Sequence, residues 1–161
     1  MAIASVLTDS FKTELMRSGH NFDTAGATPA GSAFKLALYT SSANLGTTTT
    51  VYSATNEITN AAGSAYSAGG KALTNSGVTT STVTSHTDFA DLSVANGTAW
   101  TSASFTTRGC LIYNTSVVSG FTTNRAVCSI DFGGDKTVSN GTFSIEFPTN
   151  SSSAAIIRLT S

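Results

Sequence analysis

The hydrophobic residues at the start of the chain are spaced as they are on one face of an α-helix. Five of them recur every three or four positions: Ile3, Val6, Leu7, Phe11 and Leu15. This spacing places them in one apolar stripe, and Gly19 is a suitable residue for the end of the helix. We therefore predict an amphipathic helix within residues 1–19, whose stripe packs on the same domain or on a neighbouring subunit.

From residue 31 onward apolar and polar positions alternate, a pattern typical of half-buried β-strands. The clearest alternating segments are 34–39, 108–113, 126–132, 143–147 and 155–159, and weaker ones are 51–53, 78–83, 88–92 and 103–107. Gly-Gly and Asn-Gly pairs between several of these segments indicate turns. The pattern predicts one mainly β domain in which residues 31–161 form an antiparallel β-sandwich or barrel-like fold after the helix.

Two hairpins follow from the local sequence. Within Thr137–Phe147, the pair Asn140-Gly141 favours the positive φ angles of a type I′ turn between two strands. A second hairpin is expected around Ser119-Gly120, between strands centred on Leu111 and Val127.

The second hairpin would bring the two cysteines close together. Cys110 would lie roughly opposite Cys128, so a cross-strand disulfide is possible and depends on the register. The alternative is a pair of buried thiols. We favour thiols, because the N-terminal sequence does not look like a signal peptide and disulfides are rare in a reducing cytoplasm.

Residues 40–76 are rich in serine and threonine but carry apolar residues at intervals, among them Val51, Tyr52 and Tyr66. We expect a long excursion that these residues dock onto the core, and the alternative is a mobile loop. In an assembly the excursion would lie along a neighbour, with Tyr39, Tyr52 and Tyr66 as rigid amphipathic anchors.

The composition indicates a folded domain with a neutral surface. Hydrophobic residues make up 40% of the 161 positions, charged residues only 11%, and the net charge is −1. A surface so poor in charge is weakly guarded against association, which suits a protein that sits among neighbours. We expect no nucleic-acid partner, because basic clusters are lacking. We also expect no membrane partner, because no apolar run reaches about 18 residues.

The sequence offers no matched set of catalytic or metal-binding residues. His20 and His86 are far apart and neither has a second ligand at metal spacing. The carboxylates Asp131, Asp135 and Glu146 could be neighbours across a hairpin, but a glycosidase would also need aromatic residues that stack on sugars. Trp100 is the only tryptophan, and we expect it in the core or at an interface. We therefore predict a protein that is not an enzyme and binds no cofactor or metal.

The order of segments resembles a family of small virion proteins of tailed bacteriophages. The resemblance covers nearly the whole chain, through an N-terminal helix with SFKTEL, then FKLALYTSSANLGTTTTVYSATNEI, YSAGGKALTN, FTTRGCLIYN, RAVCSIDFGGDKTVSNGTFSIEFP and AAIIRL. It implies a β-rich component of the particle, and it carries no catalytic residues over to this chain.

Together these observations predict a structural protein of the virion, made in the cytoplasm of the host bacterium. We favour a capsid decoration or cement protein that bridges capsid subunits, with other virion proteins and further copies of itself as partners. The alternatives are a tail, baseplate or fibre component, or a carbohydrate-binding module that touches the host surface. The candidate interface residues are Phe11, Leu15, Tyr39, Val51, Tyr52, Tyr66 and Trp100.

Overall fold

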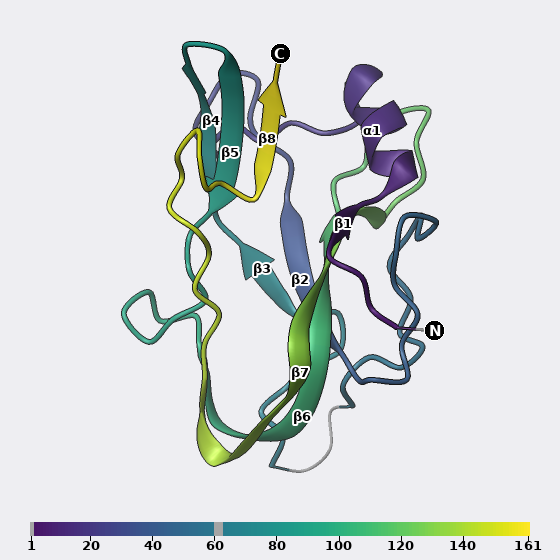
Figure 1. Cartoon of the computed structure of the whole chain (residues 1–161), viewed down its shortest axis with the longest axis vertical. Coiled ribbons are helices and arrows are strands. Elements are labelled where there is room, and N and C mark those ends of the chain that lie inside the picture. The colour runs from purple at the N-terminus through teal and green to yellow at the C-terminus, as the bar shows by residue number, and fades with distance from the viewer. Residues whose placement is uncertain (1, 60–62) are drawn as a thin grey trace.

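The computed structural model describes residues 2–59 and 63–161, and within them the fold is mainly β with one short helix, as the sequence predicts (Figure 1). In chain order the elements are β1 (Val6–Leu7), α1 (Asp9–Met16), β2 (Phe34–Tyr39), β3 (Lys71–Leu73), β4 (Asn75–Ser81), β5 (Thr84–Phe89), β6 (Trp100–Asn114), β7 (Arg125–Phe143) and β8 (Ile157–Thr160). No helix in this described part of the chain is long and apolar enough to cross a membrane.

The strands form two antiparallel sheets that do not close into a barrel. One sheet has the order β1-β7-β6-β2-β3 and the other the order β4-β5-β8. Only Thr74 separates β3 from β4, so the chain passes directly from one sheet to the other. Both sheets contribute to one inner core, in which Leu36 and Cys110 of the larger sheet belong to the same buried cluster as Phe89 and Ile157 of the smaller.

The long β6–β7 hairpin confirms the turn predicted around Ser119-Gly120. Its strands have 15 and 19 residues, and Gly120 in the connection has a φ of 83°. The register places Cys110 opposite Ile130, and Cys128 opposite Ile112. The two cysteines are therefore offset by two residues rather than directly opposite, and both are buried free thiols.

The hairpin predicted at Asn140-Gly141 is wrong. Strand β7 continues through this pair to Phe143 and remains bonded to β6. Between Ala103 and Phe105 of β6 the partner strand carries one extra residue, which makes a β-bulge. Asn140 takes a φ of 45° in this bulge, whereas Gly141 is not among the residues with a positive φ. The predicted positive φ is therefore found at Asn140 alone, in a bulge rather than in a turn.

The helix is shorter than predicted. It begins at Asp9 rather than near Ile3, because Thr8 is its N-cap and accepts a hydrogen bond from Phe11 N at 3.2 Å. Residues Val6 and Leu7 instead pair with β7. The supposed stripe is therefore divided, since Phe11 packs in the inner core while Ile3 packs in a separate cluster on the outer face of the larger sheet.

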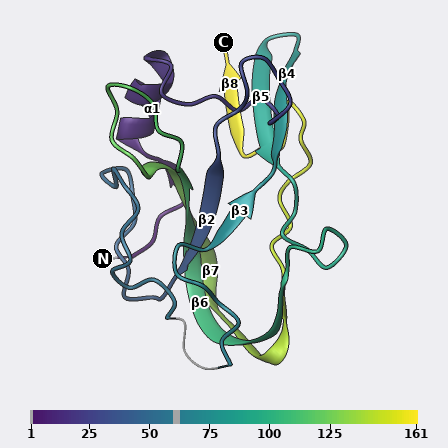
Figure 2. The ribbon, with the colours of Figure 1, turned by 180° about the vertical axis from the view of Figure 1, so that it is seen from behind.

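Strand β2 is buried on both faces, although its alternating sequence predicted a half-buried strand. Its Ala37 and Tyr39 face an outer cluster that includes Ala43 and Leu45 of the Ser/Thr-rich excursion. Backbone hydrogen bonds hold the excursion in place, for example from Tyr52 N to Asn124 O at 2.8 Å. Figures 1 and 2 show it beside the N-terminal segment. The docked excursion is thus confirmed for its described residues, whereas residues 60–62 lie outside them.

Candidate functional site

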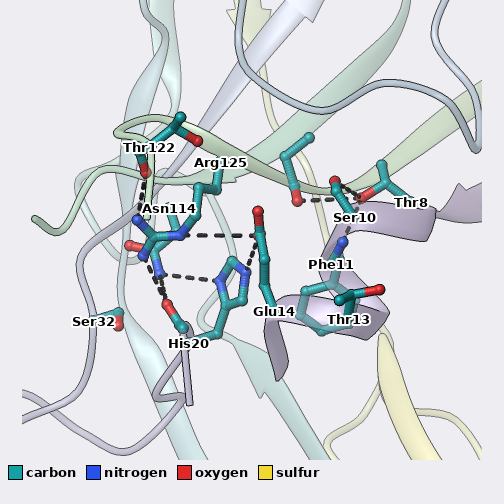
Figure 3. Close-up of polar contacts among 12 residues, drawn as sticks. Thr8, Ser10, Phe11, Thr13, Glu14, His20, Ser32, Asn114, Thr122 and Arg125 are labelled. Atoms are coloured by element: carbon teal, nitrogen blue, oxygen red, sulfur yellow. Dashed lines mark hydrogen bonds and ion pairs between the residues drawn. The ribbon is translucent and has the colours of Figure 1, made fainter. Parts of the chain in front are cut away.

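A buried ionic cluster joins α1 to the adjacent ends of β6 and β7 (Figure 3). His20 Nε2 lies 2.8 Å from Glu14 Oε2, and His20 Nδ1 lies 3.0 Å from Asn114 Nδ2. The amide nitrogen of an asparagine only donates, so Nδ1 is the acceptor and the proton of the neutral ring is on Nε2. His20 therefore donates to the Glu14 carboxylate, and both of its ring nitrogens are occupied.

Arg125 completes this cluster from the first position of β7. The side chain is fully buried, and its guanidinium donates to Gly19 O at 2.7 Å and to Thr122 O at 2.6 Å. Its Nε lies 3.9 Å from Glu14 Oε2, which places a carboxylate beside the buried positive charge. The arginine thus connects Gly19 in the segment that follows the helix, the β6–β7 connection and the sheet in one network.

The electrostatic setting of His20 suits a structural role. Burial lowers its pKa, and the hydrogen bond to Glu14 only partly opposes this. A neutral histidine could act as a general base only through a free ring nitrogen, and neither is free here. A surface cavity of about 590 Å³ lies alongside, lined by His20, Asn21, Pro29 and Ser116 among others, but the histidine faces it with no open acceptor.

A second buried carboxylate, Glu57, holds the Ser/Thr-rich excursion together. Its Oε1 accepts from the Tyr66 hydroxyl at 2.6 Å and from Gly69 N at 2.7 Å, and its Oε2 accepts from the Tyr52 hydroxyl at 2.6 Å. The Tyr66 oxygen in turn accepts from Leu38 N at 2.9 Å. Burial, reinforced by the hydrogen bonds to Glu57, raises the pKa of both tyrosines. The network anchors the excursion to β2.

Four of the seven interface candidates lie in the protein's own core, so their side chains offer no surface to a partner. These are Phe11, Tyr39, Tyr66 and Trp100. The two tyrosines are held inside because their hydroxyls find internal acceptors, Ser53 O for Tyr39 and Glu57 for Tyr66. The sequence could not reveal these acceptors, because both belong to a loop without a regular pattern.

The other three candidates reach the surface to different degrees. Leu15 and Tyr52 are half-buried, and Tyr52 stacks on Tyr113 with ring centroids 4.6 Å apart. Val51 is 39% exposed, although its backbone bridges to Arg125 in β7. The predicted strand around Val51 is reduced to this isolated bridge. Most of the exposed residues described in the excursion are therefore serines and threonines.

The hairpin across which the carboxylates considered for sugar hydrolysis could have been neighbours is absent. Asp131 is occupied by Arg108, whose Nε donates to it at 2.7 Å, and this ion pair lowers the pKa of the carboxyl. Asp135 and Glu146 are exposed. Within residues 2–59 and 63–161, no three His, Cys, Asp or Glu side chains are grouped to hold a metal ion.

An apolar groove of about 510 Å³ opens beside β7, and the sequence analysis missed it. Its main apolar walls are Ile130, Phe132, Phe143, Ile145, Phe147 and Ile156, all half-buried. The alternation of Phe143, Ile145 and Phe147 was assigned to one strand of a hairpin. The same alternation was the available signal, because it places three large apolar side chains on one face of the chain.

Comparisons of this chain with protein-family models, with curated proteins and with solved structures found no match.

Proposed function

We propose that this chain is a non-enzymatic structural component of a tailed-phage virion, and specifically a decoration protein that bridges capsid subunits. Placement in a phage particle rests on the resemblance of the sequence segments. The geometry supports a structural role of this kind. The inner core shared by two open antiparallel sheets also supports assigning the domain to the β-sandwich class.

The observation that carries the proposal is the use made of the buried ionisable groups. Glu57 accepts three hydrogen bonds from its own chain, and His20 has both ring nitrogens engaged. Each network fixes a loop to the sheet rather than presenting a reactive group in a cavity. A rigid scaffold with a neutral, hydroxyl-rich surface provides contact area, which an assembly protein needs.

A specific observation also favours one alternative, the carbohydrate-binding module. A cavity of about 380 Å³ in the excursion is lined by neutral donors and acceptors, including Asn44, Thr49, Ser53 and Asn56. Neutral hydroxyl and amide groups are suited to a sugar. Tyr39 is the aromatic residue of this lining, and it is buried. The cavity therefore lacks the exposed stacking surface that sugar sites use, and the carbohydrate-binding module remains an alternative to the structural role.

The proposal is tested by reconstitution. Virions of the encoding phage that lack this protein are incubated with the purified chain, separated from free protein, and analysed for bound chain and for stability to heat or chelator. We expect saturable binding to heads and increased head stability. Binding to isolated tails alone would place the protein in the tail. Failure to bind either part, together with saturable binding to a glycan array, would support the carbohydrate-binding module instead.

A further inference from the structure

His20 connects the segment that follows α1 to the adjacent ends of β6 and β7 (Figure 3). Its Nδ1 accepts from Asn114 Nδ2 at 3.0 Å, and next to it Gly19 O accepts from the guanidinium of Arg125 at 2.7 Å. The side chain of His20 has no exposed surface. Residues 17–20 are therefore joined to the sheet through a contact that includes a buried titratable ring.

The orientation of the Asn114 amide is fixed by a second hydrogen bond. Its Oδ1 accepts from Ser116 N at 2.8 Å, and a backbone N–H group only donates. The amide oxygen must therefore face Ser116, which leaves the N–H₂ group facing His20. Rotation of the amide by 180° would set this N–H₂ group against the Ser116 N–H. The asparagine thus offers the ring a donor, and it offers an acceptor only at the cost of the Ser116 bond.

This contact requires that Nδ1 of His20 is unprotonated. In the neutral ring the proton is on Nε2, which donates to Glu14 Oε2 at 2.8 Å. A second proton would be placed on Nδ1, directly against the Asn114 donor. Two opposed N–H groups in a site closed to water leave a buried cation without its hydrogen bond, which is unfavourable. Protonation and this contact therefore exclude each other.

The groups that surround the ring act in the same direction. Burial has the largest effect and lowers the pKa of His20 from 6.5. Glu14 of α1 favours the charged ring, and Arg125 of β7 opposes it. The neighbours from the other elements that pack on the ring carry no charge: Phe11, Phe22, Phe34 and Asn114. A His20 side chain released into water would therefore take up the proton more readily than the buried one.

We propose that His20 is an acid-sensitive switch, whose protonation releases residues 17–20 from the ends of β6 and β7 while the two sheets remain folded. In the open form the ring lies in water and Nδ1 carries the second proton. The larger sheet does not depend on this contact, because β2, β6 and β7 are joined by their own ladders. The inference rests on these contacts and does not depend on the virion placement.

Residue-resolved hydrogen exchange of the whole chain tests this opening. The amides of Ser18 and Gly19 donate to carbonyls of the last turn of α1, so their exchange reports the release of residues 17–20. Corrected for intrinsic rates, it should accelerate by up to about tenfold between pH 7.5 and 5.5, the limit for one proton with an open-form pKa of 6.5. It should also be at least about tenfold faster than exchange in β2 and β6, where amides open by global unfolding.

Three variants separate the switch from a general effect of acid. Asn114→Asp supplies a carboxylate that accepts from a protonated Nδ1 and from Ser116 N together, so the acceleration by acid should disappear. His20→Gln cannot titrate and should also show no acceleration. Asn44→Asp is the matched control, because it makes the same change at an exposed site, and it should respond to acid like the wild type. Circular dichroism checks that each variant is folded.

The proposal is overturned if folded His20→Gln or Asn114→Asp accelerates in acid as the wild type does, because the switch would then lie elsewhere. It is also overturned by a wild-type chain in which the amides of Ser18 and Gly19 do not respond to this change of pH. Exchange at these two amides that is no faster than in β2 and β6 would contradict it as well, since the segment would then open only when the whole domain unfolds.

Discussion

The hydroxyl of Tyr66 donates to Glu57 Oε1 at 2.6 Å, and through this bond a loop residue without regular structure is fixed to the core of the sheet. Tyr66 is fully buried and Glu57 nearly so. A buried carboxylate is stable only when donors replace the lost water, and three donors do so here. The relationship explains how a segment rich in serine and threonine keeps a defined shape.

The first prediction concerns this carboxylate. Replacing Glu57 with Gln keeps the size of the side chain but sets an amide N–H₂ group, a donor, against a donor of the network. We expect the free energy of unfolding to fall by about 1–3 kcal/mol, measured by urea denaturation. Asp135→Asn, the same kind of change at an exposed site, should alter it by less than about 0.5 kcal/mol. Equal effects of the two variants would show that the Glu57 network contributes little.

The second prediction concerns the helix. Phe11 is buried and contacts the rings of His20 and Phe22, at centroid distances of 5.0 and 5.9 Å. Phe11→Ala should reduce the free energy of unfolding by about 3–5 kcal/mol, because it leaves a cavity in the core. Met16 lies on the same helix and is 82% exposed, so Met16→Ala should be nearly neutral. A mild effect of Phe11→Ala would mean that α1 is only loosely attached.

The third prediction is a pH dependence. Burial lowers the pKa of His20 from its ordinary value of 6.5, so the unfolded chain binds this proton more tightly than the folded chain. The contribution of His20 to stability is therefore greatest above pH 6.5, falls as the pH decreases through 6.5, and levels off below the folded pKa. Glu14, Arg125 and Asn114 face the ring.

His20→Gln isolates this contribution, because the variant cannot titrate. Its free energy of unfolding, measured by denaturant titration between pH 5 and 7.5, should vary less with pH than that of the wild type. Asp88 contributes a pH dependence of the opposite sign to stability, because burial raises the pKa of its carboxyl from 3.8. This group is present in both proteins. Identical pH profiles for wild type and variant would show that His20 is not the titrating group.

The fourth prediction concerns the cysteines. Burial raises the pKa of the Cys128 thiol to about 12 and that of Cys110 well above its usual range, so both thiols should resist alkylation in the folded protein. In denaturant without reductant, intact-mass analysis should show two alkyl groups per chain. Two cysteines that react only after a reductant is added would instead establish a disulfide.

The sequence allowed β2, β6, β8, the first part of β7 and the β6–β7 hairpin to be predicted, because alternation and turn residues are local signals. It missed β3, and the predicted segment 78–83 runs across the turn between β4 and β5. It did not allow the partner of each segment to be chosen. Asn140-Gly141 suits a bulge as well as a turn, and only the long-range pairing with β6 decides between them. Likewise Val6 and Leu7 fit a helical stripe, but pairing with β7 and the cap at Thr8 override it.

The buried networks could not be predicted from the sequence either, because their residues are far apart along the chain. His20 and Asn114 are 94 positions apart, and Arg125 reaches Gly19 across 106. No short motif encodes such contacts, so the histidine looked isolated in the sequence. The candidate tyrosines were recognised as anchors, and their hydroxyls find acceptors in the same chain: Glu57 for Tyr52 and Tyr66, and Ser53 O for Tyr39.

The most direct test of the proposed structural role in a virion is the number of copies per particle. Purified virions of the encoding phage would be digested and quantified by mass spectrometry against isotope-labelled peptides, with the major capsid protein as the internal reference. The account predicts a number on the order of hundreds, comparable with the number of capsid subunits that a decoration protein bridges. A count between six and a few dozen would place the chain in the tail, and its absence from the particle would contradict the structural role altogether.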